Sequence, residues 1–326
     1  MSTAFQIAGG TVMGREHYRL RANRQDAYRI ERRGEVTVAV VCDGCGDPDS
    51  PHSEVGAALG ARMIAHRLAV QLATDDCRLA TPEGIGKTLE GVRRETLAGL
   101  RKLARSMGDD LVRAISDCLL FTVVGCAINA THAAFFSLGD GVIIVNGQAT
   151  LLGPYPDNAP PYMAYALLDG CKEQCDLRFS IQHHTSTSAL ESFLIGSDGV
   201  RDLMEQGRQY LPGTNEVVGE IDTFWQAYEY YVNPHALNNR LRLINTDQVR
   251  IDWQAHRKAT DWGRLADDTT LVVGIRVTHA DQDKLHFGLK EVPSEVKFSA
   301  PQGAMGRCLK SYLPLKGGSV GGRFIA

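Results

Sequence analysis

Residues 36–44 read VTVAVVCDG, a short and mostly β-branched run that ends in an aspartate and a glycine. A continuous apolar run of this length predicts a strand that is buried on both faces. Residues 193–199 read FLIGSDG and repeat the order of apolar strand, aspartate and glycine. Both runs therefore place an acidic side chain at the point where a buried strand ends.

The other predicted elements come in clusters. Strands are expected at residues 119–128, 133–138, 142–145, 192–195 and 271–277. Helices are expected at residues 53–72 with Ser53 as N-cap, at residues 82–107 with Pro82 in the first turn, and from about residue 200. Clustered strands with segregated helices favour an α+β class over the alternation of a doubly wound parallel sheet.

Two further stretches carry weaker signals. Residues 153–188 are rich in Pro, Asp and His and have little periodicity, so we expect a long irregular excursion, which in a compact domain usually has a function. The spacing of four aromatic residues predicts one helical face that packs in the core rather than a cofactor site. These residues are Phe224, Trp225, Tyr228 and Tyr231.

The composition excludes several classes of protein. The 326 residues are 44% hydrophobic, which is enough apolar content to exclude global disorder. The net charge of −3 gives no electrostatic case for nucleic acid or a membrane surface. No apolar run approaches the ~18 residues of a membrane span, and the first residues do not resemble a signal peptide. We therefore expect a cytoplasmic protein with neither kind of partner. Cys42, Cys118 and Cys126 lie in apolar runs and are expected to be buried reduced thiols, and Cys42-x-x-Cys45 is not expected to bind zinc.

Acidic residues recur beside the apolar strands. They are Asp26, Asp43, Asp140, Asp198 and the pair Asp267-Asp268. An Asp-Gly pair can simply be a hairpin turn, because glycine accepts a positive φ, and this alternative accounts well for Asp140-Gly141. It accounts poorly for Asp43 and Asp198, since a helix rather than a returning strand is expected after each.

Convergence of these carboxylates at one edge of packed sheets would explain all of them. Crowded carboxylates cannot all stay ionised unless their pKa values rise strongly. Mg²⁺ and Mn²⁺ relieve that repulsion and prefer oxygen ligands. A pair of such ions ~3.5–4 Å apart can activate a water molecule for in-line attack on phosphorus. The sequence contains no G-x-S-x-G or H-E-x-x-H motif that would supply a competing mechanism.

Five segments carry a family resemblance. They are RANRQDAY, VAVVCDGCG, FFSLGDG, FLIGSDGVRDLM and ADDTTLVV, spread in this order over residues 9–278. In wording and order they resemble the metal-dependent protein phosphatases of the protein phosphatase 2C family, in its bacterial-type branch. The resemblance implies a four-layer α-β-β-α sandwich with two central antiparallel sheets flanked by helices. It also implies a catalytic domain over residues 1–278, a flap-like insertion at residues 153–188, and a partly flexible C-terminal extension at residues 279–326.

The same resemblance implies a set of metal ligands. Asp43 would bridge two Mn²⁺ or Mg²⁺ ions, and the carbonyl of Gly44 would bind one of them. Asp198 and Asp267 would complete the ligands of the other ion. Asp140, together with Asp198, matches a position that can hold a third and weaker ion.

Other family positions act on water and on the substrate. Asp26 would hold a metal-bound water, Arg21 is the nearest candidate for binding the substrate phosphate, and His17 would serve as phosphate ligand or proton donor. Two positions depart from the family pattern. Gln25 stands where the family often has Glu, and residues 45–56, CGDPDSPHSEVG, replace the usual Gly-Gly-His stretch.

The implied activity is hydrolysis of phosphoserine and phosphothreonine in proteins by a metal-activated water, without a covalent intermediate. The partner would be a phosphorylated protein substrate, with a Ser/Thr kinase acting in the opposite direction in signalling. Two alternatives stay open. Gln25 and the altered loop favour a non-catalytic phosphatase-like module that binds a partner or regulates it, and a phosphatase for small phosphorylated molecules is the other.

Overall fold

Two five-stranded antiparallel sheets form the centre of the computed structural model, which describes residues 5–156, 159–168, 176–254 and 256–277. Sheet A contains, in spatial order, β1 (Phe5–Val12), β12 (Thr269–Arg276), β9 (Ser192–Gly196), β6 (Gly141–Val145) and β7 (Gln148–Leu152). Sheet B contains β2 (Ala27–Arg33), β3 (Val36–Cys42), β4 (Val123–Ile128), β5 (His132–Leu138) and β8 (Ser180–Ser186). A separate two-stranded ribbon is formed by β10 (Gln248–Asp252) and β11 (Arg257–Asp261).

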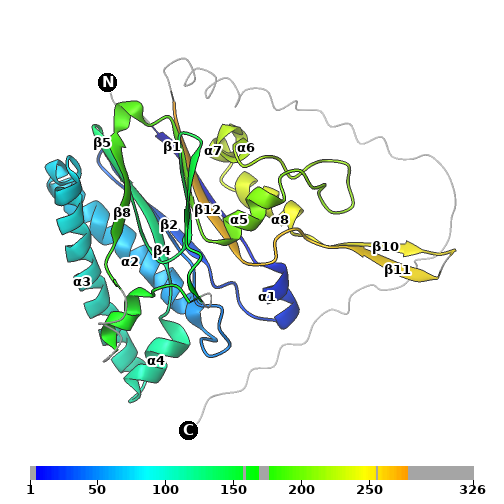
Figure 1. Cartoon of the computed structure of the whole chain (residues 1–326), viewed down its shortest axis with the longest axis horizontal. Coiled ribbons are helices and arrows are strands. Elements are labelled where there is room, and N and C mark those ends of the chain that lie inside the picture. The colour runs from blue at the N-terminus through cyan, green and yellow to red at the C-terminus, as the bar shows by residue number, and fades with distance from the viewer. Residues whose placement is uncertain (1–4, 157–158, 169–175, 255, 278–326) are drawn as a thin grey trace, which may run out of the picture. The chain divides into compact units, whose positions relative to one another are not determined.

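Helices flank the two sheets (Figure 1). Those beside sheet B are α2 (Ser53–Thr74), α3 (Pro82–Met107) and α4 (Leu111–Cys118). Those beside sheet A are α5 (Gly199–Glu205), α6 (Thr223–Gln226), α7 (Glu229–Val232) and α8 (Ala236–Ile244). Short helices lie at α1 (Arg15–Leu20), η1 (Asp76–Leu79), η3 (Met163–Leu167) and η4 (Thr187–Ala189). The expected α+β sandwich with two central antiparallel sheets is confirmed.

The apolar run of β3 contributes to two different cores. Successive residues of a strand point to opposite faces, so Val38 and Val40 pack against the helices beside sheet B. Ala39 and Val41 pack in the layer between the two sheets. All four side chains are at most 1% exposed. The run lacks polar alternation because β3 is covered on both faces, as the sequence predicted.

Residues 153–188 contain more regular structure than the sequence indicated. Met163–Leu167 form η3, and β8 is an edge strand of sheet B. The strand was missed because its residues, SIQHHTS, are mostly polar and only partly buried, as an edge position allows. The flap role of this segment stays a prediction.

Two local predictions were wrong. Ser53 is not the N-cap of α2: it is the first helical residue, and its hydroxyl donates to the carbonyl of Cys45 at 2.8 Å. The aromatic residues do not share one helix either, because α6 and α7 are separate single turns. Phe224 and Trp225 are buried as expected, whereas Tyr228 is 39% exposed and Tyr230, which was not predicted to lie in the core, is buried.

The boundary between the domain and its extension stays a prediction, because residues 279–326 lie outside the described residues. Among the helices that are described, none has the length and apolar character that crossing a bilayer requires.

Candidate active site

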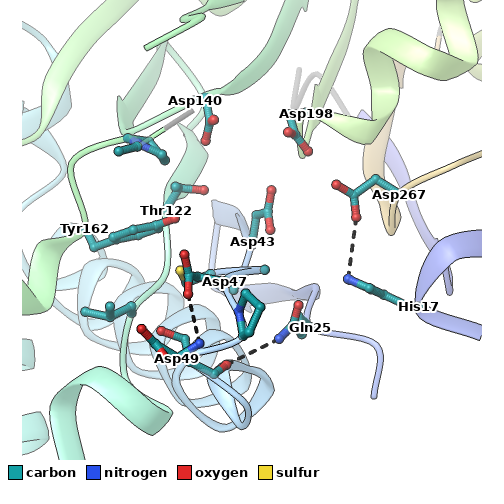
Figure 2. Close-up of a pocket in the computed structure, with 18 of the residues that line it drawn as sticks. His17, Gln25, Asp43, Asp47, Asp49, Thr122, Asp140, Tyr162, Asp198 and Asp267 are labelled. Atoms are coloured by element: carbon teal, nitrogen blue, oxygen red, sulfur yellow. Dashed lines mark hydrogen bonds and ion pairs between the residues drawn. The ribbon is translucent and has the colours of Figure 1, made fainter. Parts of the chain in front are cut away.

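Four aspartates from both sheets surround one cavity. Asp43 follows β3 and Asp140 lies between β5 and β6, whereas Asp198 follows β9 and Asp267 precedes β12. All four line a cavity of about 740 Å³. Figure 2 shows their carboxylates facing the same space. The structure thus brings together acidic residues that are more than 200 positions apart in the sequence.

Backbone contacts fix the turn that carries Asp43. The N–H of Thr122 donates to the Asp43 carbonyl at 2.8 Å, and the N–H of Gly44 donates to the Gln25 carbonyl at 3.2 Å. A Cβ at Gly44 would lie only 2.8 Å from that same Gln25 oxygen. Glycine is therefore required at position 44, because the β2 and β3 segments approach each other closely there.

Asp140 lies in a crossover between the sheets. Gly139 and Gly141 on either side have φ values of +94° and +132°, which glycine tolerates and L side chains rarely adopt. The hairpin alternative is wrong here, because β5 pairs only within sheet B and β6 only within sheet A. The tight connection leaves the Asp140 side chain 8% exposed at the cavity wall.

Asp198 and Asp267 are held close by another glycine. A Cβ at Gly199 would overlap the carbonyl oxygen of Asp268, so the start of α5 packs directly on the segment before β12. The N–H of Ala266 also donates to the Asp202 carboxylate of α5, at 3.3 Å. These contacts bring the ends of β9 and β12 together on the cavity side.

Asp26 is buried rather than exposed to the cavity. It is 3% exposed and is not among the residues that line the cavity. Its Oδ2 accepts a hydrogen bond from the Ser197 hydroxyl at 2.7 Å. Burial, together with the charges of Asp268 and Asp198, raises the pKa of Asp26 to about 8.

Crowding also raises the pKa values of the lining aspartates. Burial and the charges of Asp26 and Asp198 hold the pKa of Asp43 well above its usual range. Burial and Asp198 raise the pKa of Asp140 to about 6. Both shifts have the direction expected for carboxylates that repel one another in a desolvated site, and a bound divalent cation would counter them.

Asp268 is a structural carboxylate, a role that was not predicted from the sequence. It is 2% exposed, and it accepts backbone hydrogen bonds from Gly14 at 2.7 Å and from Gln25 at 2.5 Å. Its Oδ1 lies 2.9 Å from Nδ1 of His17. The sequence signal for this role was the position of Asp268 directly before a buried strand. A carboxylate buried at such a position needs several hydrogen-bond donors.

His17 reaches the cavity from α1. Its Nε2 lies 3.9 Å from the Asp267 carboxylate, and the residue lines the cavity. The hydrogen bond to Asp268 raises the pKa of His17, against the opposing effect of burial. The imidazole is thereby oriented with one nitrogen toward Asp268 and the other toward the site.

Arg21 does not reach the cavity. It ends α1 in a left-handed conformation, with a φ of 57°, and its side chain is exposed. Neighbouring arginines are engaged elsewhere: Arg15 donates to the Gly263 carbonyl at 2.9 Å, and Arg19 lies over the Trp262 ring at 4.4 Å. The described lining of the cavity contains no arginine or lysine.

The donor chemistry of the site fits a hard divalent cation. The donors are carboxylate and carbonyl oxygens, which Mg²⁺ and Mn²⁺ prefer. Asp26 Oδ1 is buried without a hydrogen-bond partner among the described residues. An unsatisfied buried acceptor is costly, and a water ligand of such an ion would satisfy it. His17, Asp267 and Asp268 also have potential ligand atoms within 4.8 Å of one another, but His17 and Asp268 already pair.

Most of the chain matches the model of a known protein family. The family model described as "Protein phosphatase 2C" matches residues 13–242. The matched region includes Asp43, Asp140 and Asp198, and it ends before Asp267. The comparison with curated proteins found no match.

Solved structures resemble the fold at low sequence identity. A bacterial serine phosphatase bearing an arginine-to-alanine mutation has 14% identity and a TM-score of 0.47, with 84% of this chain and 100% of that chain covered. The serine/threonine phosphatase Stp1 from Staphylococcus aureus has 14% identity and a TM-score of 0.45, with 85% and 97% covered. RsbX in complex with magnesium has 10% identity and a TM-score of 0.37, with 84% and 96% covered.

Proposed function

Because the chain belongs to the protein phosphatase 2C family, we propose that it hydrolyses phosphoserine and phosphothreonine in proteins with the help of two Mn²⁺ or Mg²⁺ ions. The observation that supports this proposal is the convergence of Asp43, Asp140, Asp198 and Asp267 around one cavity. The reaction would be direct hydrolysis without a covalent enzyme intermediate, since a water molecule is the nucleophile. The substrates would be products of protein serine/threonine kinases in the cytoplasm.

The proposed ligands fall into two groups. The Asp43 carboxylate would bridge both ions, with the Gly44 carbonyl on one of them. Asp198 and Asp267 would hold the other ion, and Asp140 would provide a third, weaker position. When bound, these ions lower the pKa of a water molecule and orient it for in-line attack on phosphorus.

The remaining residues would position water and move a proton. Asp26 is held through Oδ2 by Ser197, and its buried Oδ1, which has no partner among the described residues, would accept a hydrogen bond from a metal-bound water. Asp268 holds Nδ1 of His17 and leaves Nε2 directed to the cavity. A protonated His17 would then donate its Nε2 proton to the seryl or threonyl oxygen as that oxygen leaves.

Hydrolysis of p-nitrophenyl phosphate and of phosphopeptides in Mn²⁺ tests the proposal. Loss of residues that merely orient metal ligands costs 10–100-fold in activity, so Asp198→Asn is expected to lose at least about 100-fold. EDTA should abolish the activity of the wild type. Asp109→Asn, at an exposed position whose side chain has no partner among the described residues, is the matched control and should keep the wild-type rate.

Four outcomes would contradict the assignment. Equal rates for the wild type and Asp198→Asn, or a rate unaffected by EDTA, would rule out the proposed metal site. Binding of a phosphoprotein without turnover would favour the non-catalytic module instead. Turnover of small phosphate esters with none of phosphopeptides would favour the small-molecule phosphatase.

A further inference from the structure

The cavity is lined by an excess of negative charge. Its described lining contains seven acidic side chains and neither lysine nor arginine. Four of these are the converging aspartates, whose charge two divalent ions would balance. Glu16 is paired with Arg15 at 3.2 Å and with Arg19 at 2.9 Å. Two carboxylates, Asp47 and Asp49, are left without such compensation.

Asp47 and Asp49 lie on the turn that follows β3. The N–H of Ser50 donates to the Asp47 carbonyl at 2.8 Å, and the N–H of Asp49 donates to the Asp47 carboxylate, also at 2.8 Å. Both aspartates are exposed and line the cavity. No ion pair to either one occurs among the described residues. In Figure 2 they lie on the opposite side of Asp43 from Asp140 and Asp198.

This placement is unfavourable for a site that binds a phosphate dianion alone. Like charges repel over several ångströms, and the repulsion is stronger in a partly enclosed cavity than in bulk water. The repulsion is removed if the substrate brings a positive charge next to the turn. The pair of carboxylates is therefore suited to a ligand that carries both signs of charge.

A second and independent observation lies beside the turn. Gln25 lines the same cavity, is only 6% exposed, and its Oε1 has no hydrogen-bond partner among the described residues. Its Nε2 is directed to the Ser50 carbonyl at 3.5 Å, and its Oε1 would lie 3.7 Å from a Cβ at Gly46. The unsatisfied oxygen thus adjoins the acidic turn and requires a donor. Lysine and arginine side chains offer three and five donors and no acceptor.

Two aromatic rings belong to the lining of the same cavity. Tyr162 and Tyr165 line the cavity too, and their rings meet edge to face with centroids 5.4 Å apart. Aromatic faces attract ammonium and guanidinium groups, and the attraction increases when the cation is partly desolvated. Carboxylates, an acceptor amide and aromatic rings together resemble a cation-binding surface.

We propose that Asp47, Asp49 and Gln25 form a subsite for a lysine or arginine side chain of the phosphorylated polypeptide. The proposal rests on the function proposed above and names its substrate class: phosphoserine or phosphothreonine with a basic residue a few positions away. Gln25 then contributes to substrate recognition at a position where the family often has a glutamate.

Steady-state kinetics on matched phosphopeptides test the subsite. The peptides share one phosphothreonine sequence and carry either arginine or glutamine at the flanking positions. Charge interactions with two exposed carboxylates are expected to make kcat/KM about tenfold higher for the arginine peptide, mainly through KM. The preference should shrink as salt is raised, because exposed charges are screened.

Variants of the turn test whether Asp47 and Asp49 cause the preference for the arginine peptide. Asp47→Asn/Asp49→Asn should bring the ratio of the two kcat/KM values close to one, and Asp49→Lys should reverse it. Asparagine keeps an oxygen that can accept the hydrogen bond within the turn, so the double variant is expected to fold, which circular dichroism checks. Asp109→Asn/Glu191→Gln removes two exposed carboxylates that have no side-chain partner among the described residues, and it should keep the wild-type ratio.

The outcomes separate the subsite from the proposed function. If the wild type hydrolyses neither peptide nor p-nitrophenyl phosphate with Mn²⁺, the proposed function fails. If it hydrolyses both peptides equally well, the function stands and the subsite is wrong. If calorimetry shows that the double variant binds one Mn²⁺ fewer while the peptide preference is unchanged, the turn holds a metal ion and the proposal is overturned.

Discussion

At the scale of single residues, burial and mutual repulsion raise the pKa values of the carboxylates in and beside the cavity. Asp26 is the clearest case, because it is buried, its Oδ1 has no partner among the described residues, and its pKa is raised to about 8. In the unfolded chain the same group has a pKa near 3.8. Folding therefore takes up a proton at this position between those two pH values.

This uptake predicts how the stability of the metal-free protein depends on pH. The contribution of Asp26 is fully favourable below about pH 4 and is lost as pH rises toward 8, since the folded state resists ionisation. In EDTA at pH 8, Asp26→Asn should be more stable than the wild type by at least about 1 kcal/mol. Urea denaturation at several pH values measures the difference. A difference that does not grow with pH would contradict the assignment.

His17 is a base rather than an acid, but its contribution to stability also decreases as pH rises. Its pKa is raised by Asp268, so the stabilisation from this pair is present below the unfolded pKa of 6.5 and is lost as pH rises through the folded value. We expect His17→Gln to reduce the free energy of unfolding by about 1–2 kcal/mol at pH 6 and by less at pH 9. Equal losses at both pH values would mean that the ion pair is not formed.

At the scale of elements, glycines decide which segments can meet. Gly199→Ala should disturb the contact between α5 and the segment before β12, because the new Cβ would overlap the Asp268 carbonyl. The expected cost is about 1–3 kcal/mol of stability, together with weaker Mn²⁺ binding. Thermal unfolding and calorimetry measure the two effects. Gly108→Ala is the control, since nothing lies within 4 Å of its Cβ and stability should be unchanged.

Elements were predictable from the sequence where burial determines the residue pattern. The bounds of β3 and α3 agree with the prediction, because one is covered on both faces and the other begins with proline and has a strong apolar periodicity. The polar edge strand β8 was missed for the opposite reason, since an edge strand needs little apolar surface. Ser53 shows a further limit: its hydroxyl donates to the carbonyl of Cys45, eight residues earlier in the preceding loop, which helix-capping rules do not include.

Site residues were likewise predictable only where a local sequence pattern marks them. Asp43, Asp140 and Asp198 were recognisable because each is paired with a glycine beside an apolar run. Arg21 and Asp268 were not separable from their neighbours by sequence alone. Arg21 is one of several arginines near α1, and its direction depends on the helix end. In the fold, Asp268 is distinguished from Asp267 by the backbone N–H groups of Gly14 and Gln25, which donate to it, and by its contact with Nδ1 of His17.

At the scale of the whole molecule, the proposed ligands belong to both sheets. Metal binding should therefore stabilise the entire domain, by about 2.7 kcal/mol at a free ion concentration of 100 times Kd. We expect Mn²⁺ to raise the melting temperature of the wild type by several degrees. Asp43→Asn should lose most of this increase. Scanning calorimetry with and without EDTA measures it, and an equal shift in both proteins would show that the ions bind elsewhere.

The crossover at Asp140, which joins β5 of one sheet directly to β6 of the other, has a consequence for newly made chains. A chain that has assembled only one sheet would present only part of the proposed metal ligands and would not hold the proposed ions. Under the proposed function, hydrolytic competence would appear only with the completed sandwich, so immature or damaged copies would not strip phosphate from cellular proteins.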